Sequence, residues 1–115
     1  MASILDLNHL AIIGGHHDPE LREIIDDFVT ELSVHLKHAT ALIDDKASPP
    51  GEIRELAHKI RGMAGSLGFH PLAQLAAEQD HDKPVGSASE WLGRLREQIG
   101  LAITAWDELK NPGQV

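Results

Sequence analysis

Apolar residues recur at steps of three and four along three long segments of this chain, and that spacing restricts its fold more than any other feature. The segments run from Pro19 to Ile43, from Ile53 to Leu67 and from Ala88 to Leu109. Such spacing gathers apolar side chains on one face of an α-helix, whereas a half-buried strand needs strict alternation, which no segment shows. The chain is therefore predicted to be all-α.

Two of the predicted helices begin with residues that favour a helix start. Asp18 precedes Pro19 and Glu20, which supplies a capping carboxylate, a proline in the first turn and an early acid. Ser87 and Glu90 form a capping box in front of the last helix. Both signals agree with the starts indicated by the apolar spacing.

Short connections separate the helices. Residues 44–51 have the composition of a loop, and Gly68 is a suitable stop for the helix before it. Pro71 opens a further short helix that fades near residues 80–84, and residues 111–113 end the last helix. Short connections favour antiparallel neighbours in a helical protein.

The expected fold is an antiparallel four-helix bundle with a short extra N-terminal helix at residues 4–13. Residues 1–115 suffice for one core, and no linker is long enough to divide them, so a single domain is expected. Because aromatic residues are only 3 % of the chain, the core is predicted to consist of Leu, Ile, Val and Ala.

Cysteine usage and charge exclude several functions. The absence of cysteine rules out a disulfide framework, thiolate zinc sites and cysteine nucleophiles. The net charge of −8, without a basic run interleaved with aromatics, argues against nucleic-acid binding. The start is not that of a signal peptide and no apolar stretch approaches bilayer length, so a cytoplasmic protein without membrane contact is expected.

The helix predicted around residues 53–67 has a second face that packing does not explain. We count angles around the helix axis from Ile53, at about 100° per residue. The apolar side chains then cluster near 340°, roughly, whereas His58 falls at about 140°. His58 is therefore expected to stand in solvent, nearly opposite the core. The apolar set comprises Ile53, Leu56, Ala57, Ile60, Ala64 and Leu67.

Two glycines share the outer face with His58. Gly62 and Gly65 each cost about 0.8–1.0 kcal/mol relative to alanine in a helix interior, so their presence needs a reason. Bare backbone beside His58 would let a large partner approach closely. Alternatively, the glycines admit a neighbouring helix.

Cations flank the same histidine. Arg54 lies about one turn before His58 and Arg61 about one turn after it, with Lys59 at the side. Arg61 could donate charge-assisted hydrogen bonds to a phosphoryl group on the imidazole, although an ordinary solvated face would carry similar charges. Histidine suits phosphoryl transfer because its neutral ring is a nitrogen nucleophile that needs no second base.

The segment from Ala57 to Gly68, AHKIRGMAGSLG, resembles the signature of histidine-containing phosphotransfer (HPt) domains. That signature runs histidine, any residue, Leu, Lys, Gly and then small residues up to a glycine. Arg61 stands at the family's Lys position and Gly62 at its Gly, while Ile60 replaces Leu and Met63 replaces a usual Ser. Likenesses at residues 4–6, 18–21 and 72–76 extend the resemblance over nearly the whole chain.

The resemblance implies a four-helix bundle in which His58 is the phosphoacceptor and Arg61 stabilises the phosphoryl group. The implied partner is a response-regulator receiver domain whose aspartate and bound Mg²⁺ complete the transfer site, with a sensor or hybrid histidine kinase upstream. The chain is then expected to be a monomeric carrier without a metal, a cofactor or ATP-dependent kinase activity of its own. The residues expected to contact the partner are Arg54, Lys59, Gly62 and Gly65.

Two other functions stay open at this point. Di-metal carboxylate bundles use two Glu-x-x-His pairs and two further acids, all pointing into the core. The matching residues are Glu55, His58, Glu78 and His81, with Glu31 or Glu97 as further acids. Against this, Glu55 and His58 are predicted to point away from the apolar side. A bundle that only binds other proteins would also fit, and His35 with His38 could hold a surface metal.

Overall fold

Helices make up most of the structure, a computed structural model that describes residues 4–15, 17–44, 50–80 and 87–110. These residues contain no strand, which confirms the all-α prediction. The helices are α1 (Leu7–Ile12), α2 (Pro19–Asp44), α3 (Pro50–Ser66), α4 (His70–Ala77) and α5 (Ala88–Lys110).

The predicted helix boundaries agree closely with the structure. Helix α2 ends one residue later than predicted and α5 begins at the predicted residue. Helix α3 begins at Pro50, inside the stretch predicted as a loop, because proline is well suited to a first helical turn. The stop predicted at residues 111–113 lies outside the described residues.

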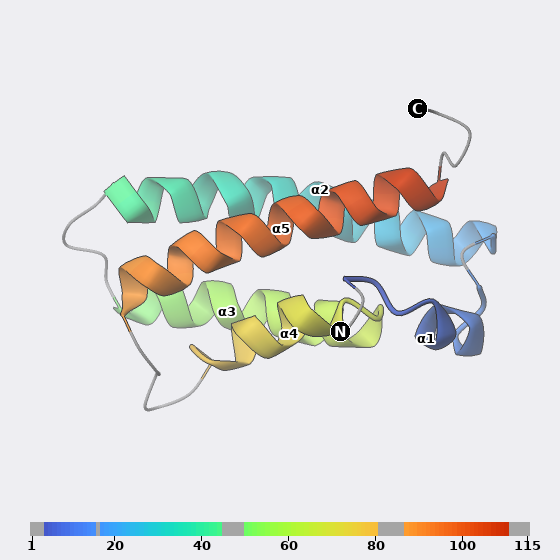
Figure 1. Cartoon of the computed structure of the whole chain (residues 1–115), viewed down its shortest axis with the longest axis horizontal. Coiled ribbons are helices and arrows are strands. Elements are labelled where there is room, and N and C mark those ends of the chain that lie inside the picture. The colour runs from blue at the N-terminus through green and yellow to red at the C-terminus, as the bar shows by residue number, and fades with distance from the viewer. Residues whose placement is uncertain (1–3, 16, 45–49, 81–86, 111–115) are drawn as a thin grey trace.

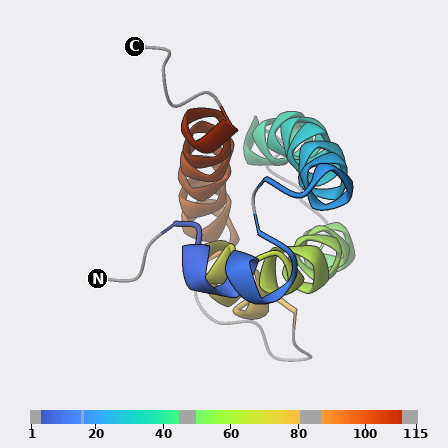
Figure 2. The ribbon, with the colours of Figure 1, turned by 90° about the vertical axis from the view of Figure 1, so that its right-hand side faces the viewer.

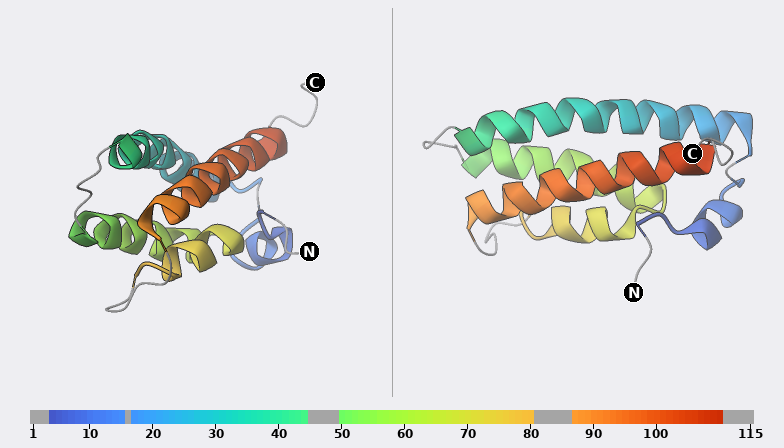
Figure 3. Two further views of the ribbon diagram at one scale, coloured as in Figure 1. Left: turned by 60° about the vertical axis from the view of Figure 1, so that its left-hand side comes forward. Right: turned by 45° about the horizontal axis from the view of Figure 1, so that its top comes forward.

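Helices α2 to α5 form an antiparallel four-helix bundle (Figure 1). Helix α2 packs against α5 and α3 packs against α4, while α4 also contacts α5 and α2 contacts α3. Viewed from the end, these helices surround a common core, and α1 lies in front of the ends of α3 and α4 (Figure 2). The left view in Figure 3 shows the α2–α5 pair lying over the α3–α4 pair. The fold predicted from sequence, including the extra N-terminal helix, is confirmed.

The core contains all four Trp and Phe residues, which corrects the prediction of a purely aliphatic interior. Phe28, Phe69, Trp91 and Trp106 are each exposed by 2 % or less. The indole N–H of Trp91 donates to the backbone oxygen of Leu75 over 2.7 Å, which ties α5 to α4. Although aromatic residues are few, they therefore fill the interior and hold neighbouring helices together.

Helix α1 closes the turn between α3 and α4. Gly68 adopts φ +89°, and the N–H of Phe69 donates to the oxygen of Ala64 over 2.8 Å, the Schellman pattern of a helix end. The N–H of Asp6 donates to the oxygen of Gly68 over 2.9 Å, and Nε2 of His9 lies 2.8 Å from the oxygen of Ser66. These contacts fix the register in which α4 returns along α3.

None of the helices, within the described ranges, combines the length and apolar character that crossing a membrane requires.

Candidate functional site

His58 stands on the outer face of α3, as the apolar spacing predicted. Its side chain is 77 % exposed, whereas the apolar residues of the same helix are buried. Those buried residues are Ile53, Leu56, Ala57, Ile60, Ala64 and Leu67. The core contacts of α3 therefore hold the backbone under His58 rigid while its imidazole remains accessible.

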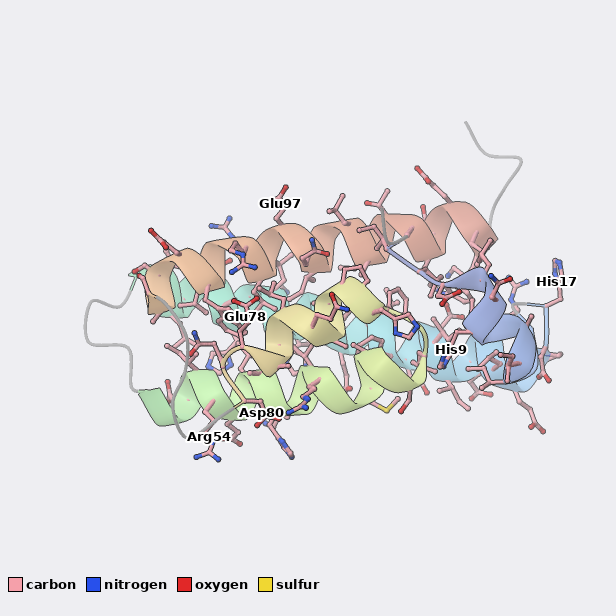
Figure 4. The ribbon with its side chains drawn as sticks, turned by 60° about the horizontal axis from the view of Figure 1, so that its bottom comes forward. His9, His17, Arg54, Glu78, Asp80 and Glu97 are labelled. Atoms are coloured by element: carbon pink, nitrogen blue, oxygen red, sulfur yellow. The ribbon has the colours of Figure 1, made fainter. Side chains whose placement is uncertain are left out.

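Asp80, which follows α4, contacts the side chains of both His58 and Arg61 on α3. Its Oδ2 lies 3.2 Å from Nδ1 of His58 and accepts a hydrogen bond from Nη1 of Arg61, also over 3.2 Å. The Asp80 side chain is only 13 % exposed, and its backbone N–H donates to the oxygen of Ala76 over 3.2 Å. Figure 4 shows Asp80 at the end of α4, beside α3. The carboxylate is thus held in place by the last turn of α4.

Sequence reasoning missed Asp80, but a signal for it exists. In an antiparallel helix pair, residues equally distant from the turn lie opposite each other. Gly65 and Ala73 are equally distant in sequence from Phe69, and they do lie opposite each other. A Cβ atom added to Gly65 would lie 3.8 Å from that of Ala73. His58 and Asp80 are likewise equally distant in sequence from Phe69. Counting outward from the turn would therefore have placed an acid opposite His58.

The electrostatics of this contact favour an ionised carboxylate. The hydrogen bond from His58, and secondly the one from Arg61, hold the pKa of Asp80 below its ordinary value, while partial burial opposes them. An ionised carboxylate only accepts hydrogen bonds. Nδ1 of His58 must therefore carry the proton in this contact, which leaves Nε2 as the ring nitrogen with a lone pair whenever the imidazole is neutral.

His58, Arg61, Gly62 and Asp80 line an open depression of about 370 Å³. Apart from its chain neighbours and the backbone of its own helix, no atom lies within 4 Å of the position that a Cβ of Gly62 would occupy, so this glycine is bare. Gly65 differs from the prediction: it is half-buried against Ala73, because α4 passes over that side of α3. The alternative of a glycine beside a neighbouring helix thus holds for Gly65 and not for Gly62.

The other predicted cations lie outside the depression. Lys59 pairs with Glu55 over 3.3 Å on the exposed surface of α3. Arg54 is exposed, and its side chain points away from the bundle in Figure 4. The structure therefore brings Arg61 and Gly62 together with His58, and leaves Arg54, Lys59 and Gly65 around them.

The residues of the di-metal alternative are dispersed. Glu78 accepts two hydrogen bonds from Arg94, over 2.9 and 3.0 Å, and Glu97 is exposed on α5. His81 lies outside the described residues. Among those that the structure describes, no three His, Asp or Glu side chains are placed to hold a metal ion.

The α2–α3 groove contains the other histidine pair. His35 and His38 line a depression of about 120 Å³ between these helices, and burial lowers the pKa of His35. Lys59 lines the same depression, and its positive charge opposes the binding of a metal ion by these two histidines.

Comparison with known proteins agrees with this geometry. A family model described as Hpt domain matches residues 23–107, a range that includes His58, Arg61 and Asp80. Neither curated proteins nor solved structures give a significant match to the chain. Hpt domains are helical bundles that serve histidine phosphotransfer in two-component systems, and this chain belongs to their family.

Proposed function

We propose that His58 accepts a phosphoryl group at Nε2 and passes it on, so that the chain is a carrier in a phosphorelay. The observation that carries this proposal is an imidazole that is 77 % exposed while its Nδ1 is held 3.2 Å from a carboxylate. The carboxylate orients the ring and fixes the proton on Nδ1. Nε2 then presents its lone pair toward solvent, where a phosphorylated partner can approach.

Arg61 is proposed to stabilise the transferred group. A phosphoryl group brings three strong acceptor oxygens, and a guanidinium can donate to them through two N–H groups. The Arg61 side chain is 48 % exposed and belongs to the same depression as His58, so it has room to reorient. Phosphoryl transfer depends mainly on such positioning and charge neutralisation, and not on a strong base.

The proposed partner is a receiver domain, with a sensor or hybrid histidine kinase as the upstream source. The receiver's aspartate would exchange the group with Nε2 of His58, and the Mg²⁺ held by the receiver would neutralise charge on the moving group. The bare backbone at Gly62 leaves space for that approach. In this scheme the chain contributes a nucleophile and one cation, and the partner contributes the metal and the second nucleophile.

Loss of His58 tests the proposal directly. The chain is incubated with a receiver domain loaded with labelled phosphate, and the parent is compared with His58→Gln, His35→Gln and His38→Gln. We expect His58→Gln to take up no label, whereas the other two variants label at the parental rate because their rings lie on the α2 side of α3. Labelling of His58→Gln at the parental rate would show that another residue is the acceptor.

A further inference from the structure

One carboxylate oxygen serves two groups in the unphosphorylated site. Oδ2 of Asp80 accepts from Arg61 and contacts Nδ1 of His58 over the same distance of 3.2 Å. Both contacts must respond when Nε2 gains a phosphoryl group. We propose that the Asp80 carboxylate makes phosphorylated His58 a ready donor, because it keeps the proton on Nδ1 and competes with the phosphoryl group for Arg61. This inference rests on the proposed role of His58.

The proton on Nδ1 decides how the ring leaves. In the donor step, an oxygen of the acceptor carboxylate forms a bond to phosphorus, the Nε2–P bond breaks, and its electron pair returns to Nε2. If Nδ1 holds its proton, the ring leaves as neutral imidazole. Without that proton it would leave as an imidazolate anion, which is a far poorer leaving group. A carboxylate beside Nδ1 favours the protonated, positively charged ring, so Asp80 favours the reactive form.

Competition for Arg61 acts in the same direction. Among the described residues, Arg61 supplies the guanidinium that lines the depression, and Asp80 already accepts a hydrogen bond from it. A phosphoryl group must therefore share Arg61 with a fixed negative charge, which also repels it. Asp80 thus raises the tendency of the site to give up the group.

The remaining charges near His58 supply a matched control. On α3 these are Arg54, Lys59 and Glu55, and Glu55 lies about one turn before His58, paired with Lys59 over 3.3 Å. Glu55→Gln removes one negative charge from this face without touching Nδ1. Asp80→Asn removes one negative charge but keeps an oxygen that can accept from Nδ1. Comparing the two variants separates the effect of the Asp80 carboxylate from a general change in charge.

The test uses phosphoramidate, a small phosphoryl donor, on the full chain without any receiver. Phosphorus NMR then follows the decay of phosphohistidine and its ring titration in the parent, Asp80→Asn, Asp80→Glu and Glu55→Gln. Removing the carboxylate should slow the decay by about tenfold at neutral pH, because fewer of the phosphorylated rings then keep the proton on Nδ1. Asp80→Glu should restore fast decay, and Glu55→Gln should behave as the parent.

The outcomes separate this inference from the proposed function. If the parent takes up no phosphoryl group at His58, the proposed function fails and the inference fails with it. If the parent is phosphorylated but Asp80→Asn decays and titrates as the parent does, only the role of Asp80 is overturned. Faster decay in Asp80→Asn would also overturn it, since Asp80 would then protect the group. Thermal melts of each variant establish that the compared proteins are folded.

Discussion

Replacing Gly62 with glutamine should separate the stability of the bundle from its transfer function. Gly62 lies in the interior of α3, and no atom beyond its chain neighbours and its own helix backbone lies within 4 Å of its missing Cβ. A side chain there meets solvent and gains helix propensity. The fold should therefore tolerate glutamine, whereas a partner docking over His58 should not.

The stability change follows from helix propensity. Glycine is about 0.8–1.0 kcal/mol worse than alanine in a helix interior, and glutamine ranks slightly below alanine, which leaves a gain of roughly 0.5 kcal/mol. For a domain of this size that gain corresponds to a rise in Tm of about 2–4 °C. Transfer should change in the opposite direction, because a displacement of about 1 Å between reacting groups can cost around a hundredfold in rate.

Two controls make the measurement specific. Gly93 is an exposed glycine of α5 with nothing within 4 Å of its missing Cβ, so Gly93→Gln should raise Tm similarly and leave transfer unchanged. Phosphoramidate is small, so it should phosphorylate Gly62→Gln at nearly the parental rate while transfer from a labelled receiver domain falls by tenfold or more, about 1.4 kcal/mol or more in barrier.

Two results would refute this reasoning. A fall in Tm for Gly62→Gln would mean that the glycine serves packing within the protein and does not lie on a free surface. A normal Tm with normal receiver transfer would mean that the partner docks away from Gly62. In either case the bare backbone beside His58 would need another explanation.

Three further substitutions test the site and the scaffold. Arg61→Ala should leave Tm nearly unchanged but slow receiver transfer, measured with labelled phosphate; a large drop in Tm with normal transfer would show a structural role. Asp26→Ala should lower the free energy of unfolding in denaturant by about 1–3 kcal/mol, because Oδ1 of Asp26 accepts from the buried indole of Trp106 over 2.7 Å. Asp26→Asn keeps an acceptor oxygen and should lower it less. The hydrogen bonds from Trp106 and, over 2.9 Å, from Lys110 lower the pKa of Asp26. The contribution of Asp26 to stability should therefore be present above the ordinary aspartate pKa and fade as pH falls below it, unlike in Asp26→Asn. Gly68→Ala should destabilise by about 1–3 kcal/mol, since φ is +89° and the new Cβ would lie 3.2 Å from the oxygen of Asp6; an unchanged Tm would contradict this.

Sequence reasoning succeeded where the information is local. The apolar residues of α3 follow one another at helical spacing, so the buried face and the opposite position of His58 can both be derived within one helix. The same holds for the start of α2, where Asp18 accepts from the N–H groups of Glu20 and Leu21 over 2.9 and 3.3 Å. Caps and faces depend on neighbours within a turn or two, and these are read directly from the chain.

Features that depend on how two helices meet were missed or wrong. The environment of Gly65 depends on where α4 passes, and the hydrogen bond of Trp91 depends on which backbone oxygen of α4 lies opposite its indole. Neither can be derived from one helix alone. Asp80 belongs to this class as well, because its contact with His58 requires the register that the turn at Gly68 imposes.

The division of the site between α3 and the end of α4 has a physical consequence. His58 and Arg61 lie on one helix about a turn apart, so their spacing is set by helix geometry alone. The position of Asp80 depends instead on the whole turn, which Gly68, Asp6 and the packing of α1 hold in place. We therefore expect substitutions in α1 or in the turn, far from the proposed phosphoryl site, to act on that site through Asp80. The proposed nucleophile and its cation are properties of one helix, whereas the proposed control of the Nδ1 proton is a property of the fold.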